Sequence, residues 1–80
     1  MIKVDCRLYA GLRKYAPEYG LGEAMKLELP DGTTLAELYG VLKVPPDEVK
    51  RTFVNGISKG PGHPISDGDR VALFPPIGGG

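Results

Sequence analysis

The sequence has few of the residues that build metal sites and disulfide frameworks. Among its 80 residues it contains no tryptophan, one cysteine (Cys6) and one histidine (His63). A single cysteine cannot form a disulfide within its own chain, and one Cys with one His supplies too few ligands for a zinc site. The sequence therefore predicts neither a disulfide-held miniprotein nor a metal site.

An excess of charge of one sign and a long apolar segment are also lacking. Ten Lys and Arg residues balance ten Asp and Glu residues, so the formal net charge is +0. A protein that binds nucleic acid or an anionic membrane needs a basic footprint, and a membrane-spanning helix needs about eighteen consecutive apolar residues. Residues 1–10 alternate in polarity and lack the continuous apolar region of a signal peptide. We expect no nucleic-acid or membrane partner and a cytoplasmic location.

The remaining composition is that of one small globular domain, with 41% hydrophobic and 25% charged residues. Alternation of apolar and polar residues predicts half-buried strands. These strands are expected at residues 2–8, 24–29, 52–56 and 70–74. Cys6 belongs to the apolar set of the first strand, so we expect a buried, inert thiol rather than a redox group.

One longer amphipathic helix is predicted within residues 33–44. Its apolar stripe at positions i, i+3, i+4 and i+7 consists of Leu35, Leu38, Tyr39 and Leu42. Thr34 and Glu37 have the spacing of a capping box, and the prolines at 45 and 46 end the helix.

Shorter helical turns are expected at 11–16 and 46–52, and residues 57–66, rich in Gly and Pro, are predicted to form an irregular edge. One helix with four or five strands favours a two-layer α+β domain.

The chain ends in PPIGGG, residues 75–80, directly after the last predicted strand. Proline cannot donate to a strand ladder, so Pro75 and Pro76 stop the sheet. Glycine has no Cβ, so the last three residues can pass through a narrow channel. We therefore expect a domain at residues 1–75 and an extended tail at 76–80, which is either a frayed end or a reactive tail whose working group is the Gly80 carboxylate.

Several short segments of the sequence together resemble one family. They are YAGLRK after the first strand, PDGTTLAEL at the start of the helix, FVNG, HPISDGDRVALFPP and the terminal Gly79 and Gly80. In this order, and over essentially the whole chain, they resemble the small subunit of molybdopterin synthase and its sulfur-carrier relatives (MoaD- and ThiS-like proteins). The resemblance implies a ubiquitin-like β-grasp fold, with a mixed sheet of four or five strands, one main helix across one face and a flexible Gly-Gly tail.

The resemblance also implies a chemistry for the last residues, Gly79 and Gly80. An E1-like adenylating enzyme, using ATP and Mg²⁺, would join AMP to the Gly80 carboxylate, and a sulfur donor would then displace AMP to leave a thiocarboxylate. The large subunit of molybdopterin synthase would use this sulfur for a molybdenum or tungsten cofactor. The chain itself would bind no cofactor and would not be a catalyst alone.

Other destinations of the terminal carboxylate stay open. The sulfur could serve thiazole synthesis for thiamine or tRNA thiolation. A ubiquitin-like modifier would instead join its activated terminus to a lysine. A plain interaction module would leave the tail passive.

Two aromatic residues are candidates for partner binding. In the predicted last strand, Phe74 points to the other face from Val71 and Leu73. Directly after the first strand, Tyr9 points to the other face from Leu8. Both rings therefore point away from the helix-covered core. Exposed aromatics beside a functional tail suggest a docking face, and the alternative is a minor packing cluster. The partner-binding set is Arg7, Tyr9, Ala72, Phe74, Pro75, Pro76, Ile77 and Gly78. We expect His63 to lie in a surface loop, and Asp67 and Asp69 to serve a turn.

Overall fold

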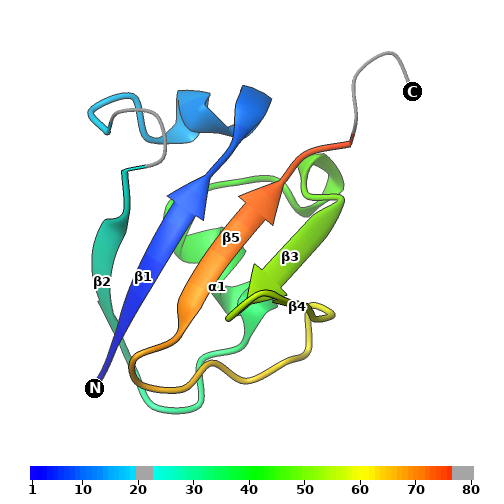
Figure 1. The fold of residues 1–80 in the computed structure, drawn as a ribbon. Helices are drawn as coiled ribbons and strands as arrows, with labels where there is room; N and C mark the ends of the chain where they lie inside the picture. Colours follow the sequence, from blue (N-terminus) through cyan, green and yellow to red (C-terminus); the bar gives the residue numbers. More distant parts are fainter. Residues whose placement is uncertain (20–22, 77–80) are drawn as a thin grey trace.

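The computed structural model describes residues 1–19 and 23–76. Its elements are two 3₁₀ helices (η), one α-helix and five strands (Figure 1). In chain order they are β1 (Ile2–Leu8), η1 (Ala10–Tyr15), β2 (Met25–Leu29), α1 (Leu35–Leu42), η2 (Pro46–Glu48), β3 (Arg51–Val54), β4 (Ile57–Ser58) and β5 (Arg70–Phe74).

The strands form one mixed sheet in the order β2-β1-β5-β3-β4. β1 and β5 run parallel, and the other neighbouring pairs are antiparallel. α1 lies across one face of the sheet (Figure 1). The predicted two-layer α+β arrangement is confirmed.

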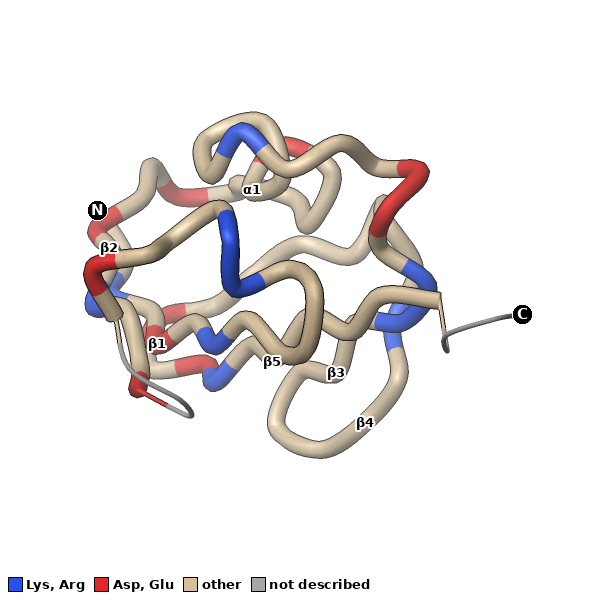
Figure 2. The backbone as a smooth tube through the Cα atoms, turned by 90° about the horizontal axis from the view of Figure 1, so that it is seen from above, with Lys and Arg blue, Asp and Glu red and all other residues tan. Residues whose placement is uncertain are grey.

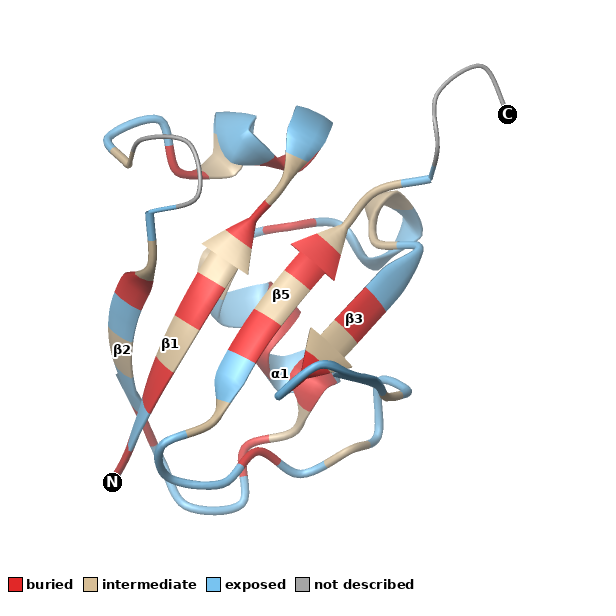
Figure 3. Cartoon of the chain, viewed as in Figure 1, coloured by how far each residue is buried: buried red, intermediate tan, exposed pale blue. Residues whose placement is uncertain are grey.

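Burial alternates along the strands because successive side chains point to opposite faces. On β5, Val71 and Leu73 are 1% and 0% exposed, whereas Ala72 and Phe74 are half-buried (Figure 3). Buried residues of α1, η1 and the sheet form a single core cluster. The face of the sheet that carries Phe74 is therefore the one that α1 leaves uncovered.

The predicted capping box starts α1. The Thr34 hydroxyl accepts from the Glu37 N–H at 3.3 Å, and the Glu37 carboxylate accepts from the Thr34 N–H at 2.9 Å. The helix ends two residues earlier than the sequence pattern predicts, because Lys43 adopts the left-handed conformation (φ 60°). Leu42 and Leu27, both expected in the core, are half-buried at its edge.

The Gly- and Pro-rich segment 57–66 is more ordered than the sequence suggests. Asn55 and Gly56 both have positive φ (52° and 84°), as a tight hairpin turn requires, and β4 follows directly, in a segment that the sequence predicts to be irregular. Further along, the carbonyl of His63 accepts from the Leu35 N–H at 3.0 Å. This segment thus satisfies a backbone donor that the start of α1 would otherwise leave unpaired.

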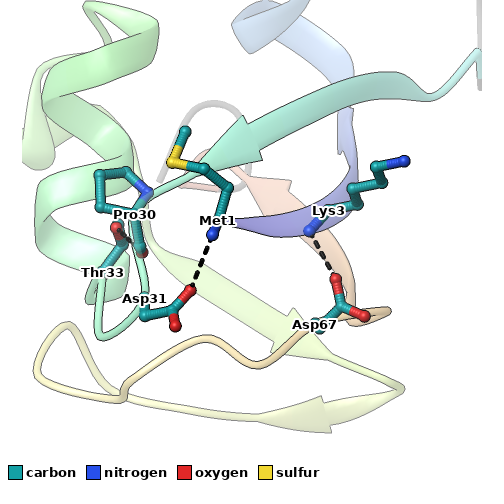
Figure 4. Close-up of polar contacts among 6 residues, drawn as sticks. All are labelled: Met1, Lys3, Pro30, Asp31, Thr33 and Asp67. Carbon is teal, nitrogen blue, oxygen red and sulfur yellow. Dashed lines mark hydrogen bonds and ion pairs between the residues drawn. The ribbon is translucent and has the colours of Figure 1, made fainter.

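The turn before β5 ties the two parallel strands together. The Asp67 carboxylate accepts from the Lys3 N–H at 2.7 Å (Figure 4), and the Asp69 carboxylate accepts from the Ser66 N–H at 2.8 Å. The Asp69 carboxylate also accepts from the side-chain amide of Asn55 at 2.9 Å. Both aspartates therefore serve the turn, as expected.

The two faces of β5 should respond differently to truncation. Leu73→Ala removes a fully buried side chain, and we expect it to lower the free energy of unfolding by about 2–5 kcal/mol. Phe74→Ala removes a half-buried ring and should cost only about 1–2 kcal/mol, close to what stacked ring pairs contribute. Urea unfolding of both variants measures the difference. A Phe74→Ala loss as large as that of Leu73→Ala would contradict the assignment of faces.

Candidate functional site

The end of β5 is held from both sides. The Leu73 carbonyl accepts from the Tyr9 N–H at 3.2 Å, and the Phe74 carbonyl accepts from the Lys50 N–H at 2.8 Å. Pro75 and Pro76 follow, and neither has an N–H with which to continue a ladder. The backbone is therefore anchored up to Phe74 and leaves the sheet at the end opposite the amino terminus (Figure 1).

Three aromatic rings gather at this point on the uncovered face. The rings of Tyr9 and Phe74 stack with their centroids 4.6 Å apart and their planes 2° from parallel. The ring of Phe53 meets Phe74 edge-on at 5.5 Å. Ala72 is the register partner of both Arg7 and Phe53. We call Tyr9, Phe53, Ala72 and Phe74 the aromatic face.

A hollow of about 390 Å³ opens at the aromatic face. The methyl group of Ala72 fills little space between its larger neighbours, and two arginines, Arg7 and Arg70, contribute to the lining. All four residues of the aromatic face are half-buried. A partner side chain can therefore bury more of each ring, which is the usual property of an interface anchor.

The structure brings together four predicted partner-binding residues from β1, β5 and the start of η1: Arg7, Tyr9, Ala72 and Phe74. Sequence reasoning missed Phe53, although its alternation with buried Thr52 and Val54 carries the signal. Pro75 is half-buried and Pro76 exposed, directly beyond the aromatic face. The other predicted site residues lie outside the described part of the chain: Ile77, Gly78, Gly79 and Gly80.

A polar bridge connects the two 3₁₀ helices that flank the end of β5. The Tyr15 hydroxyl donates to the Glu48 carboxylate at 2.6 Å, and Lys14 Nζ lies 3.3 Å from its other oxygen. The hydrogen bond from Tyr15, followed by the interactions with Lys14, holds the pKa of Glu48 below its ordinary value. The same hydrogen bond raises the pKa of Tyr15. Sequence spacing gives no sign of this pair, because its members lie in separate elements.

Cys6 and His63 have structural positions away from the aromatic face. Cys6 is 0% exposed, and burial raises the pKa of its thiol to about 12, so the thiol stays protonated at neutral pH. This confirms the inert interpretation. His63 is half-buried in its loop and holds the start of α1 through its backbone.

No group of three or more His, Cys, Asp or Glu side chains suited to a metal occurs among the described residues. None of their helices is long and apolar enough to cross a membrane.

Comparison with known proteins identifies the family. The chain belongs to the ThiS family, which matches residues 7–80. No curated protein sequence matches the chain significantly. The fold is ubiquitin-like, as in the solved structures that it resembles.

Three solved structures illustrate the likeness. Small archaeal modifier protein 1 of Haloferax volcanii superposes with a TM-score of 0.75 at 18% identity, covering 96% of this chain and 100% of its own. A putative molybdopterin converting factor subunit 1 of Pyrococcus furiosus superposes with a TM-score of 0.73 at 24% identity, covering 96% of this chain and 100% of its own. A chain in a complex of subunits 1 and 2 of the molybdopterin-converting factor of Helicobacter pylori superposes with a TM-score of 0.61 at 22% identity. The match covers 99% of this chain and 100% of that one.

The lowered pKa of Glu48 predicts a dependence of stability on pH. A carboxylate with a depressed folded-state pKa stabilises the fold above its ordinary pKa, and this contribution is lost as pH falls through the folded value. From about pH 5 to about pH 3, the free energy of unfolding should therefore fall more steeply in the wild type than in Glu48→Gln. Urea unfolding across this range tests the difference. Parallel pH profiles would show that the Tyr15–Glu48 bridge contributes nothing.

Proposed function

We propose that the chain is a sulfur carrier and the small subunit of a molybdopterin synthase. An E1-like adenylating enzyme uses ATP and Mg²⁺ to adenylate the Gly80 carboxylate. A hydrosulfide donor then attacks the carbonyl carbon, AMP leaves, and a terminal thiocarboxylate remains. The large subunit takes this sulfur for the synthesis of a molybdenum or tungsten cofactor. The chain binds no cofactor and acts as a sulfur-donor subunit of a transferase.

The observation that carries this proposal is the position of the chain exit. The last hydrogen-bonded residue of β5, Phe74, belongs to the aromatic face, and the glycine-rich end follows within a few residues. A partner that docks on this face is thus placed to receive the terminus. Membership of the ThiS family supports the same chemistry.

Adenylation solves a specific chemical problem. A carboxylate is a poor acyl donor because its leaving group would be oxide, whereas an acyl adenylate releases AMP and divides one hard step into two easier ones. When extended, residues 76–80 span about 17 Å, at 3.3–3.6 Å per residue. That length lets the terminus enter a partner's active site while the domain stays outside. The prolines restrict the exit, which lowers the ordering cost on insertion.

A second candidate function has an observation in its favour. Small archaeal modifier protein 1 is as similar in fold, with a TM-score of 0.75, as the putative molybdopterin converting factor subunit 1 of Pyrococcus furiosus, with 0.73. A ubiquitin-like modifier uses the same terminal adenylate, but a lysine amine rather than a sulfur donor attacks it. Conjugate ladders in lysate, detected with an antibody to the chain, would favour this alternative. Thiazole synthesis and tRNA thiolation differ only in the sulfur acceptor.

Intact-mass measurement tests the central step. The untagged protein, incubated with its organism's adenylating enzyme, ATP, Mg²⁺ and sulfide, should gain the mass difference between one sulfur and one oxygen atom. The gain must be localised to the last peptide, because oxidation of Met1 or Met25 adds nearly the same mass. Deletion of Gly80 should abolish the gain and leave the unfolding midpoint unchanged. Unmodified wild-type protein, with an enzyme active on another carrier, would reject the proposal.

The role of the aromatic face has its own test. Phe74→Asp places an unpaired charge in the docking surface, so we expect affinity for the adenylating enzyme to fall at least about tenfold. The matched control is Val41→Asp, since Val41 is 55% exposed on α1, on the other side of the sheet. Calorimetric titration of both folded variants gives the comparison. Equal affinities would remove the aromatic face from the interface.

A further inference from the structure

Positive charge is concentrated along β5 and at the start of β3, although the chain as a whole is neutral. The hollow at the aromatic face is lined by Arg7 and Arg70 and by no acidic residue. A second hollow of about 220 Å³ is lined by Lys50, Arg51 and Lys59, again without an acidic residue. Arg51 is the register partner of Phe74, so both hollows adjoin the chain exit. Figure 2 shows this basic stretch at the start of β3.

Charge is balanced over β1 and β2 on the uncovered face. The hollow between β1 and β2 is lined by Lys3, Asp5, Lys26 and Glu28. There Lys26 Nζ lies 2.9 Å from the Asp5 carboxylate, and Lys3 and Glu28 are register partners. The fold thus separates a neutral region over β1 and β2 from a basic region over β3 and β5. Arg70, the register partner of Asp5, lies where the two regions meet.

Two of the arginines are available to a partner. Arg51 and Arg70 are both exposed, and neither forms an ion pair with a described residue. Because their guanidinium groups are not committed to an internal carboxylate, they keep their capacity for paired hydrogen bonds to an incoming one. Guanidinium binds carboxylates in a fixed, two-pronged geometry that lysine cannot reproduce.

We propose that Arg51 and Arg70 select a protein partner whose contact surface carries carboxylates around an apolar side chain. The apolar side chain enters the hollow over Ala72. One carboxylate meets Arg70, which lines that hollow, and another meets Arg51, the register partner of Phe74 on β3. This inference rests on the proposed function, and it assigns such a surface to the adenylating enzyme. Rim charges of this kind act mainly on association rate and on discrimination between partners, and salt weakens them.

The observations favour a protein over single-stranded nucleic acid. Proteins that bind single strands offer aromatic ring faces on which bases stack. Here Tyr9 and Phe74 stack on each other, and the edge-on contact with Phe53 further crowds Phe74. The same surface also leads directly into the tail that the proposed chemistry requires a partner to receive.

Calorimetric titration with the organism's adenylating enzyme tests the inference, at about 50 mM and about 400 mM NaCl. The site variant is Arg51→Gln with Arg70→Gln. The control is Lys3→Gln with Lys26→Gln, which removes the same charge from the balanced hollow. In low salt we expect the site variant to raise the Kd about five- to tenfold and the control less than about twofold. High salt should weaken wild-type binding and largely abolish the difference.

Several outcomes would overturn the inference. These are equal effects of the two double variants, wild-type affinity that is independent of salt, and no binding of the enzyme at all. Arginine-dependent binding of a uridine oligonucleotide, with unchanged enzyme affinity, would assign the surface to nucleic acid instead. The intact-mass assay separates this test from the proposed function. Sulfur gain with no arginine effect rejects only this inference, whereas arginine-dependent binding without sulfur gain supports it and rejects the carrier chemistry.

Discussion

β5 lies between β1 and β3, and its last two residues are each held by a different neighbour. The Leu73 carbonyl is bound from the β1 side by Tyr9, and the Phe74 carbonyl from the β3 side by Lys50. In an 80-residue chain with a small core, such a doubly paired strand supplies a rigid base at the point where the chain leaves the sheet. The position of the tail and of the aromatic face both depend on this pairing.

The alternation of side chains lets β5 serve stability and recognition separately. Its inward residues, Val71 and Leu73, are buried in the common core, and its outward residues, Ala72 and Phe74, belong to the aromatic face. Changes on the outward side can therefore alter a docking surface at little cost to the fold. This separation suits the proposed function, in which different partners receive the terminus in turn.

Charge follows the same division of the molecule. Carboxylates take structural roles in the turn before β5, in the cap of α1 and in the Glu48 bridge. Arg7 and Arg70 instead line the hollow at the aromatic face, and Arg51 lines the second hollow. A chain with no net charge can thus present arginines to a partner, because several of its carboxylates are engaged in contacts within the fold.

The sequence by itself determined most of the local structure. Alternation located β1, β2, β3 and β5, and the capping box of Thr34 and Glu37 located α1. These features depend on neighbours within a few residues, so they can be predicted without knowledge of the tertiary structure. The order of motifs, ending in Gly79 and Gly80, indicated the family that the comparison identifies.

Only the tertiary structure decided which distant residues meet. The stack of Tyr9 on Phe74, the addition of Phe53 and the bridge between Tyr15 and Glu48 join elements that are far apart along the chain. The separation of basic and balanced hollows likewise follows from strand order, which no local pattern specifies. Such contacts depend on which strands pair and in which register, and that choice is made by the burial of the core as a whole.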